Sequence, residues 1–227
     1  MNSSILIYLF LNFALLFLCG KISYSLNLLD IPNKRKIHNK ATAYTGGIAL
    51  SIILLCSIIL FDSFNRSLSL ILSIGFLISI VGLIDDKYNL NIGGKLSLQI
   101  IPIFYLIIFE KFALNQIGNY GLFDTDLGAF SIPFTFLSVL FLINAFNYFD
   151  GVDGTLGFTT ISVFGILYFL SIEQSSHFLI SDQYSQFFLI AIIIPISVFL
   201  LFNFSFLNLP KMFLGDSGSL LLGFIVS

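Results

Sequence analysis

The string LGAFSIPFTFLSVLFLINAFNYF, residues 127–149, shows most directly what kind of fold this chain can form. It runs for 23 residues without an Asp, Glu, Lys or Arg. A helix needs about 20 mostly apolar residues to cross the hydrocarbon core of a bilayer. The last turns of this run overlap the polar string NAFNYFDGVDG at 144–154. The stretch therefore predicts a membrane-spanning helix that ends in amides and carboxylates.

Similar uncharged runs occur on both sides of this stretch along the chain. They cover residues 1–20, 41–61, 67–84, 96–109, 154–172 and 183–210, and a further apolar run at 217–227 contains only 11 residues. The run at 96–109 is short, so spanning requires the flanking Lys95 and Lys111 to extend toward the two interfaces. We therefore expect an all-α polytopic transmembrane helical bundle with about seven complete spans plus the start of an eighth. It forms a single integral-membrane domain over residues 1–227.

The composition agrees with a membrane protein and excludes other classes. The chain is 57% hydrophobic and 10% charged, with a mean hydropathy of +1.01. Soluble globular domains average about 25% charged residues, so these residues cannot build a water-facing surface. A net charge of −2 does not suit a nucleic-acid-binding protein. Cys19 and Cys56 both lie in apolar runs, which argues against a disulfide or metal framework.

The basic residues indicate how the spans are oriented. When successive runs alternate across the bilayer, eight Lys and Arg fall on one side and only Arg66 and Lys111 on the other. Loops rich in Lys and Arg remain in the cytoplasm, so the N-terminus is expected outside. The eight are Lys21, Lys34, Arg35, Lys36, Lys40, Lys87, Lys95 and Lys211.

Four polar strings lie at span ends on this cytoplasmic side. They are DIPNKRKIH at 30–38, GLIDDK at 82–87, NAFNYFDGVDG at 144–154 and FLGDSGS at 213–219. Acids on the outer side occur in loops with no comparable pattern. Each string alone has an ordinary structural explanation, but together they favour a site for a phosphorylated substrate and a hard metal.

The adjacent Asp85 and Asp86 illustrate both readings. Like charges this close favour a shared proton or a bound cation, and oxygen ligands without thiolates suit Mg²⁺ or Mn²⁺. The simpler explanation, and the better one for this pair alone, is two acids that cap a helix end at the interface.

Amides and acids also recur every three residues in the third string. Asn144, Asn147, Asp150 and Asp153 would follow one inward face, since three residues turn a helix by about −60° per step. Gly151 and Gly154 are expected to loosen the helix. Polar residues inside a membrane indicate function, although hydrogen bonds between helices would explain one or two of them.

The remaining two strings also have two explanations each. Asp216 or Ser217 could be an N-cap, or the free N–H groups of that helix end could bind a phosphate. The basic string around Arg35 and His38 could set the orientation by attracting anionic lipid head groups, or it could bind substrate phosphates.

Taken in order and on one side, the four strings resemble those of the polyprenyl-phosphate N-acetylhexosamine-1-phosphate transferases. The chain is most similar to the undecaprenyl-phosphate GlcNAc-1-phosphate transferase branch, which carries Asp-x-Pro-Asn-x-Arg-Lys-x-His, present here at 30–38. The paired aspartates, the Asn-x-x-Asn-x-x-Asp-Gly-x-Asp-Gly element and the Gly-Asp-x-Gly-Ser element match at 85–86, 144–154 and 215–219.

The resemblance implies roles for individual residues. Asp85, Asp86 and Asp216 would be catalytic, by placing a metal, accepting a proton or attacking as a nucleophile. Asp216 and Asp150 would bind Mg²⁺, with Mn²⁺ as a substitute. The implied substrate-binding residues are Asn33, Arg35, Lys36, His38, Asn144, Asn147, Asp150 and Asp153.

The implied reaction transfers a sugar 1-phosphate, N-acetylhexosamine 1-phosphate in this branch, from a UDP-sugar to undecaprenyl phosphate. UMP is released, and a lipid-linked cell-surface glycan such as O-antigen is initiated. The expected partners are the UDP-sugar and undecaprenyl phosphate within the bilayer, with a homodimer as one candidate assembly and no nucleic acid. The expected location is the inner (plasma) membrane, with the active site on the cytoplasmic face.

Three alternatives remain at this stage. The family continues for several more spans and a further His-containing loop, so we expect this chain to be incomplete at its C-terminus, and it could be an inactive fragment. An ion-coupled membrane transporter would also place acids in a helical bundle, but such folds favour repeats and midplane acids, which this sequence lacks. A non-catalytic scaffold would tolerate alanine in all four strings.

Overall fold

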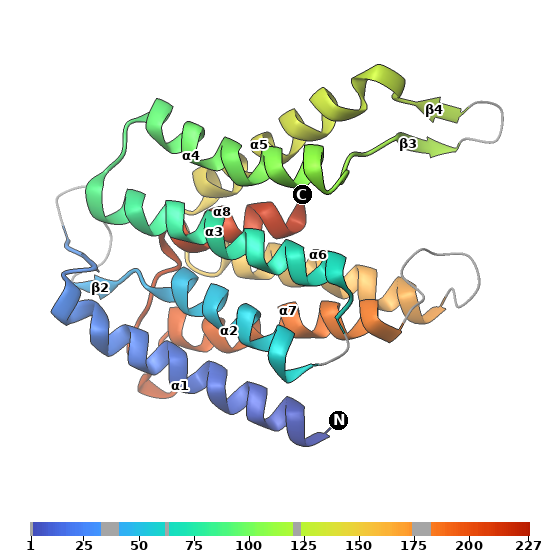
Figure 1. Cartoon of the computed structure of the whole chain (residues 1–227). Coiled ribbons are helices and arrows are strands. Elements are labelled where there is room, and N and C mark those ends of the chain that lie inside the picture. Colours follow the sequence, from blue (N-terminus) through green and yellow to red (C-terminus); the bar gives the residue numbers. More distant parts are fainter. Residues whose placement is uncertain (1, 33–40, 62–63, 120–123, 174–182) are drawn as a thin grey trace.

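The computed structural model describes residues 2–32, 41–61, 64–119, 124–173 and 183–227 (Figure 1). Within these residues the chain forms eight α-helices, two short antiparallel strand pairs and three brief turns of other helix types. The helices are α1 (Asn2–Leu26), α2 (Gly46–Leu60), α3 (Arg66–Tyr88), α4 (Ile92–Phe104), α5 (Ser131–Phe149), α6 (Thr155–Glu173), α7 (Gln183–Asn203) and α8 (Gly215–Val226).

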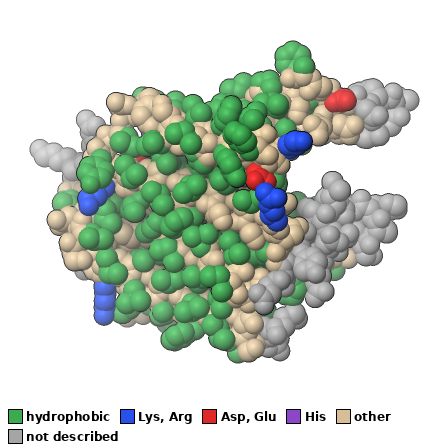
Figure 2. All heavy atoms as spheres, in the orientation of Figure 1, with side chains coloured by type: hydrophobic (Ala, Val, Ile, Leu, Met, Phe, Trp, Pro, Cys, Tyr) green, Lys and Arg blue, Asp and Glu red, His purple; other side chains and the backbone are tan. Residues whose placement is uncertain are grey.

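The helices confirm the expected membrane bundle. Six helical segments are long and apolar enough to cross a bilayer: Ser3–Leu26, Arg66–Tyr88, Ile92–Phe109, Gly128–Phe149, Thr155–Ile172 and Gln186–Asn203. Figure 2 shows a broad hydrophobic face with the charged side chains confined to its margins. The apolar helices α2 and α8 are shorter, at 15 and 12 residues.

Two spans differ in extent from the uncharged runs that predicted them. The run at 41–61 becomes helical only at Gly46, because Thr42–Ala43 forms strand β2 and pairs with β1 (Leu29–Asp30). The helical segment that contains the run at 96–109 is longer than the run itself. Helix α4 begins at Ile92 and continues through the π-helical turn η1 (Tyr105–Phe109), which gives 18 residues.

Helix α8 lies at the centre of the bundle, packed against α2, α3 and α5 (Figure 1). Glycines on two neighbouring helices allow this close approach. A Cβ atom at Gly47 of α2 would lie 2.0 Å from the backbone nitrogen of Gly218. One at Gly82 of α3 would lie 2.4 Å from the carbonyl oxygen of Asp216. Backbone contacts of this kind fix the position of the first turns of α8.

Backbone hydrogen bonds hold the segment before α8 against the segment before α2. Phe213 N–H donates to the carbonyl of Ala43 at 2.8 Å, and Gly47 N–H donates to that of Leu214 at 2.8 Å. The β1–β2 pair therefore stands beside α8 at one end of the bundle. The second pair, β3 (Gln116–Asn119) with β4 (Asp124–Asp126), projects from the opposite end (Figure 1).

A tyrosine on α1 satisfies a carbonyl that a proline on α7 leaves without its helical donor. Pro195 has no N–H to give to the carbonyl of Ala191, four residues earlier. The fully buried Tyr8 hydroxyl donates to that carbonyl at 2.8 Å. This bond ties α1 to α7 and explains how the proline is accommodated in lipid.

Tyr8→Phe should therefore lower the free energy of unfolding by about 1 kcal/mol, since a buried acceptor loses its donor. In a Pro195→Ala background the same substitution should lower the free energy of unfolding by clearly less, because the restored N–H of residue 195 then donates to the Ala191 carbonyl. Thermal unfolding in detergent of the wild type, the two single variants and the double variant measures this double-mutant cycle. An equal cost in both backgrounds would contradict the explanation.

Candidate functional site

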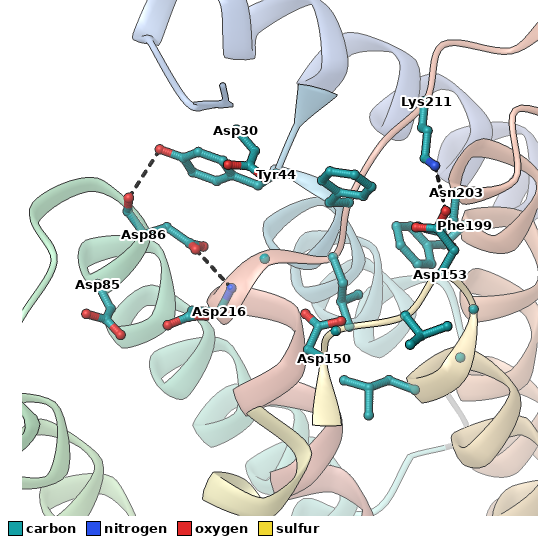
Figure 3. Close-up of a pocket in the computed structure, with 18 of the residues that line it drawn as sticks. Asp30, Tyr44, Asp85, Asp86, Asp150, Asp153, Phe199, Asn203, Lys211 and Asp216 are labelled. Carbon is teal, nitrogen blue, oxygen red and sulfur yellow. Dashed lines mark hydrogen bonds and ion pairs between the residues drawn. The ribbon is translucent and has the colours of Figure 1, made fainter. Parts of the chain in front are cut away.

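A pocket of about 850 Å³ opens at the end of the bundle that carries β1 and β2 (Figure 3). Acidic side chains from four separate parts of the chain face it. Among the described residues that line it, six are aspartates and one is a lysine, Lys211. The aspartates are Asp30, Asp85, Asp86, Asp150, Asp153 and Asp216. The convergence expected from the four strings is thus present for those parts that the structure describes.

Lys95 joins three of the elements around this pocket. Its Nζ lies 2.7 Å from Oδ2 of Asp85, 2.6 Å from Oδ2 of Asp216 and 2.8 Å from Oδ1 of Asn147. The side chain comes from the start of α4, where Asn91 accepts the Gly94 N–H and caps the helix. Lys95 therefore turns into the site at the end of the bundle.

Asp216 and Asn147 form the second half of the same network. Asn147 Nδ2 donates to Oδ1 of Asp216 at 2.9 Å and lies 2.8 Å from Oγ of Ser219. Asp216 therefore has one oxygen on a lysine and the other on an amide. Helices α3, α4, α5 and α8 each contribute to this cluster, and all four polar groups lie at the same end of the bundle.

The two adjacent aspartates make different contacts. Asp85 accepts the Leu90 N–H at 2.8 Å and pairs with Lys95. Asp86 accepts the N–H groups of Asp216 at 3.0 Å and Ser217 at 3.2 Å. The helix-capping explanation thus applies to Asp86, whereas Asp85 binds a loop amide and the lysine. The contacts of Asp86 also mean that these two amides of α8 are already occupied, so they are not free to bind a phosphate as one reading suggested.

Asp150 and Asp153 lie in the turn between α5 and α6. Helix α5 ends at Phe149, and Gly154 adopts a positive φ of 78°, so the expected loosening by glycine is confirmed. Asp153 pairs with Lys211 at 2.5 Å. Asp150 is accessible from the pocket, yet the surrounding protein atoms, together with the charges of Asp216 and Asp153, raise its pKa to about 7.

Not every predicted site residue reaches the pocket. Asn144 lies one turn earlier on α5, where its Nδ2 donates to Oε1 of Gln99 at 3.0 Å and to the Leu140 carbonyl at 2.8 Å. It does not line the pocket, so the interhelical hydrogen-bond explanation applies to it. Asn33, Arg35, Lys36 and His38 lie outside the described residues. Asp30 and Tyr44, on either side of that segment, both line the pocket.

Sequence reasoning missed several residues besides Lys95. Tyr44, Phe199, Asn203 and Phe213 add aromatic and amide groups to the lining of the pocket. Asn203 donates to the Met212 carbonyl at 3.0 Å, and no described residue bonds its buried Oδ1. The signal that could have found it was an amide within an otherwise apolar span, where polar groups indicate function.

The donors around the pocket suit a hard divalent cation in their chemistry. They are carboxylate and amide oxygens without thiolates, which Mg²⁺ prefers. No group of three or more His, Cys, Asp or Glu side chains in the described part of the chain is already arranged around one point. Burial is the main cause of the raised pKa of Asp150, and the negative charges of Asp216 and Asp153 add to it; a cation would offset that part.

Comparison with known proteins places this site in a family. Residues 67–227 match the model of glycosyl transferase family 4. The chain is 31% identical over 225 residues to the undecaprenyl-phosphate alpha-N-acetylglucosaminyl 1-phosphate transferase of Yersinia pestis, which covers 98% of this chain and 60% of that protein. The protein of the same name from Escherichia coli (strain K12) is 30% identical over 214 residues, covering 93% of this chain and 56% of its own length.

A third relative extends the comparison. The probable undecaprenyl-phosphate N-acetylglucosaminyl 1-phosphate transferase of Bacillus subtilis (strain 168) is 26% identical over 215 residues, covering 91% of this chain and 56% of that protein. The chain thus spans between 56% and 60% of the length of these relatives. Since the matched residues 67–227 contain Asp85, Lys95, Asn147 and Asp216, and six helical segments are able to span a bilayer, the chain is a multi-pass membrane protein that belongs to glycosyl transferase family 4.

Proposed function

We propose that this chain contains the active-site pocket of a transferase that moves N-acetylglucosamine 1-phosphate from a UDP-sugar to undecaprenyl phosphate and releases UMP. The observation that carries the proposal is the network in which Lys95 joins Asp85, Asn147 and Asp216 at one end of the membrane bundle. The names of the relatives supply the acceptor and the transferred group.

A divalent cation is part of the proposal because of the charge in the pocket. Six aspartates and one lysine line the described pocket, and a diphosphate entering it would be repelled. Bound Mg²⁺ supplies neutralisation of the diphosphate charge and of the charge that develops on the leaving group. Asp216 and Asp150 would hold it, since both face the pocket and their carboxylates repel each other.

The residues of the chain contribute mainly position and charge, as is usual in phosphoryl transfer. Lys95 and Asn147 hold the two oxygens of Asp216 in a fixed orientation. Asp85 in turn holds Lys95. The aromatic rings of Phe199 and Phe213 in the pocket lining suit the planar base of a nucleotide.

The proposed step is direct attack by the lipid phosphate. One of its oxygens forms a bond to the sugar-linked phosphorus of the donor, and the bond from that phosphorus to the bridging oxygen breaks, so that UMP leaves. A phosphate monoester has its second pKa near about 6, so the attacking oxygen is largely deprotonated at neutral pH. Direct attack needs no nucleophile from the protein, so Asp85 and Asp86 keep the ion pair and hydrogen bonds that they make.

The proposed location is the plasma membrane with the pocket on its cytoplasmic face. The support is the division of eight basic residues against two between the two sides. The exposed apolar faces of the helices, which Figure 2 shows on one side of the molecule, would contact lipid and the acceptor's isoprenoid tail.

The test uses membranes from cells that express the gene's complete reading frame, supplied with radiolabelled UDP-GlcNAc and undecaprenyl phosphate. We expect label in a lipid-soluble product, release of UMP, loss of both on chelation with EDTA and recovery on addition of Mg²⁺. If no labelled lipid forms while the vesicles take up an ion together with a solute, the transporter explanation replaces this one.

A further inference from the structure

Asp86 makes contacts that set it apart from Asp85. It stands near the C-terminal end of α3 and directs its carboxylate at the N-terminal end of α8 (Figure 3). Oδ1 accepts the N–H of Asp216 at 3.0 Å and Oδ2 accepts the N–H of Ser217 at 3.2 Å. The first N–H groups of a helix have no partner within it, and a carboxylate there also interacts favourably with the helix dipole. One side chain thus caps α8 from a neighbouring helix.

The backbone around this carboxylate leaves little room for another arrangement. Gly215 has a φ of +73°, and a Cβ atom there would lie 2.8 Å from Oδ2 of Asp86 and 2.6 Å from the carbonyl of Tyr44. A Cβ atom at Gly82, one turn before Asp86 on α3, would likewise lie 2.4 Å from the carbonyl oxygen of Asp216 and 2.5 Å from the Cα of Ser217. The Tyr44 hydroxyl donates to the backbone carbonyl of Asp86 at 3.3 Å. Residues 215–217 therefore rest on the surface of α3 between Gly82 and Asp86.

We propose that Asp86 is a positioning residue, which holds the first turn of α8 so that the Asp216 side chain meets Lys95 and Asn147. Each of its oxygens accepts a backbone N–H of α8, so its role is to keep that helix start in place rather than to contact the substrate. The two adjacent aspartates thus have different roles. Asp85 contacts Lys95, and Asp86 acts through the backbone of α8. This inference rests on the proposed function for the importance of Asp216.

Hydrogen–deuterium exchange of the purified chain in detergent, without Mg²⁺ or nucleotide, tests the capping contact directly. In Asp86→Asn the amide group can accept only one N–H and turns a donor toward the other. The amides of Asp216 and Ser217 should then exchange about tenfold faster, as expected for loss of a helix cap. The matched control is Asp126→Asn at the opposite end of the bundle, which should leave these two amides within about twofold of wild type, because Asp126 shares no partner with the network around Asp216. Unchanged exchange in Asp86→Asn would overturn the proposal.

A second measurement requires no variant and so does not depend on the folding of Asp86→Asn. If Mg²⁺ instead drew the Asp86 carboxylate away from α8, addition of Mg²⁺ and UMP to the wild-type chain would speed the exchange of the two amides. A positioning role predicts unchanged or slower exchange, and faster exchange would overturn it. Both measurements are independent of turnover. If the exchange is as predicted but membranes that contain the complete gene product form no lipid-linked sugar, the proposed function alone is refuted.

Discussion

Asp216→Asn should reduce Mg²⁺-dependent exchange of UMP with UDP-sugar by about 10²–10³-fold, the range found when one preorganised charge-stabilising group is removed. The substitution keeps the shape of the side chain but removes its charge. The positive charge of Lys95 would then be paired with Asp85 alone. The pocket would also lose the carboxylate that Lys95 and Asn147 hold in place. The measurement is exchange of labelled UMP in membranes that contain the complete gene product.

The matched control for this variant is Asp126→Asn at the opposite end of the bundle. Asp126 also accepts a backbone N–H close to a helix start, that of Gly128 at 2.9 Å, but it is remote from the pocket. It should retain activity within about twofold, as is usual for a surface change away from the site. Full activity in Asp216→Asn, or an equal loss in both variants, would contradict the assignment.

Gly47→Ala should destabilise the whole bundle although it adds a single methyl group. The new Cβ would lie 2.0 Å from the backbone nitrogen and 2.2 Å from the Cα of Gly218, and neither atom belongs to a side chain that could rotate away. Helix α8 would have to move away from α2. We expect a loss of about 3 kcal/mol, the upper end for overpacking, which lowers the Tm by roughly 6–12 °C for a chain of this size.

Gly165→Ala on α6 is the control for this prediction. A Cβ atom there meets nothing within 4 Å, so the same methyl group is added within a helix without a clash. The control should be neutral or slightly stabilising, because alanine favours the helix more than glycine does. Thermal unfolding in detergent compares the two variants with wild type. Equal Tm values for both would show that α8 does not pack as closely on α2 as the structure indicates.

Much of the site was predictable from local patterns. Asp85, Asp150, Asp153 and Asp216 each follow or precede an apolar run, and the alternation of spans places all of them on one side. That placement makes a meeting in one pocket possible, since span ends on one side of a bilayer share a single plane, and the packing of α8 against α3 and α5 brings them together. The position of Asn144 outside the pocket was not predictable in this way. Its spacing matches that of Asn147, but α4 presents Gln99 at that depth, and a hydrogen bond between helices results.

The length of the apolar runs was enough to determine a multi-pass helical bundle, because every backbone polar group within a bilayer needs a hydrogen bond and a helix supplies these locally. The order of the polar strings determined which ends carry the chemistry. Only the tertiary structure decided that Lys95 turns inward, that Asp86 caps a different helix, and that Gly47 and Gly82 are there for close packing. These features depend on how near and at what angle helices distant in the chain cross, and packing of whole surfaces sets that geometry rather than any local pattern.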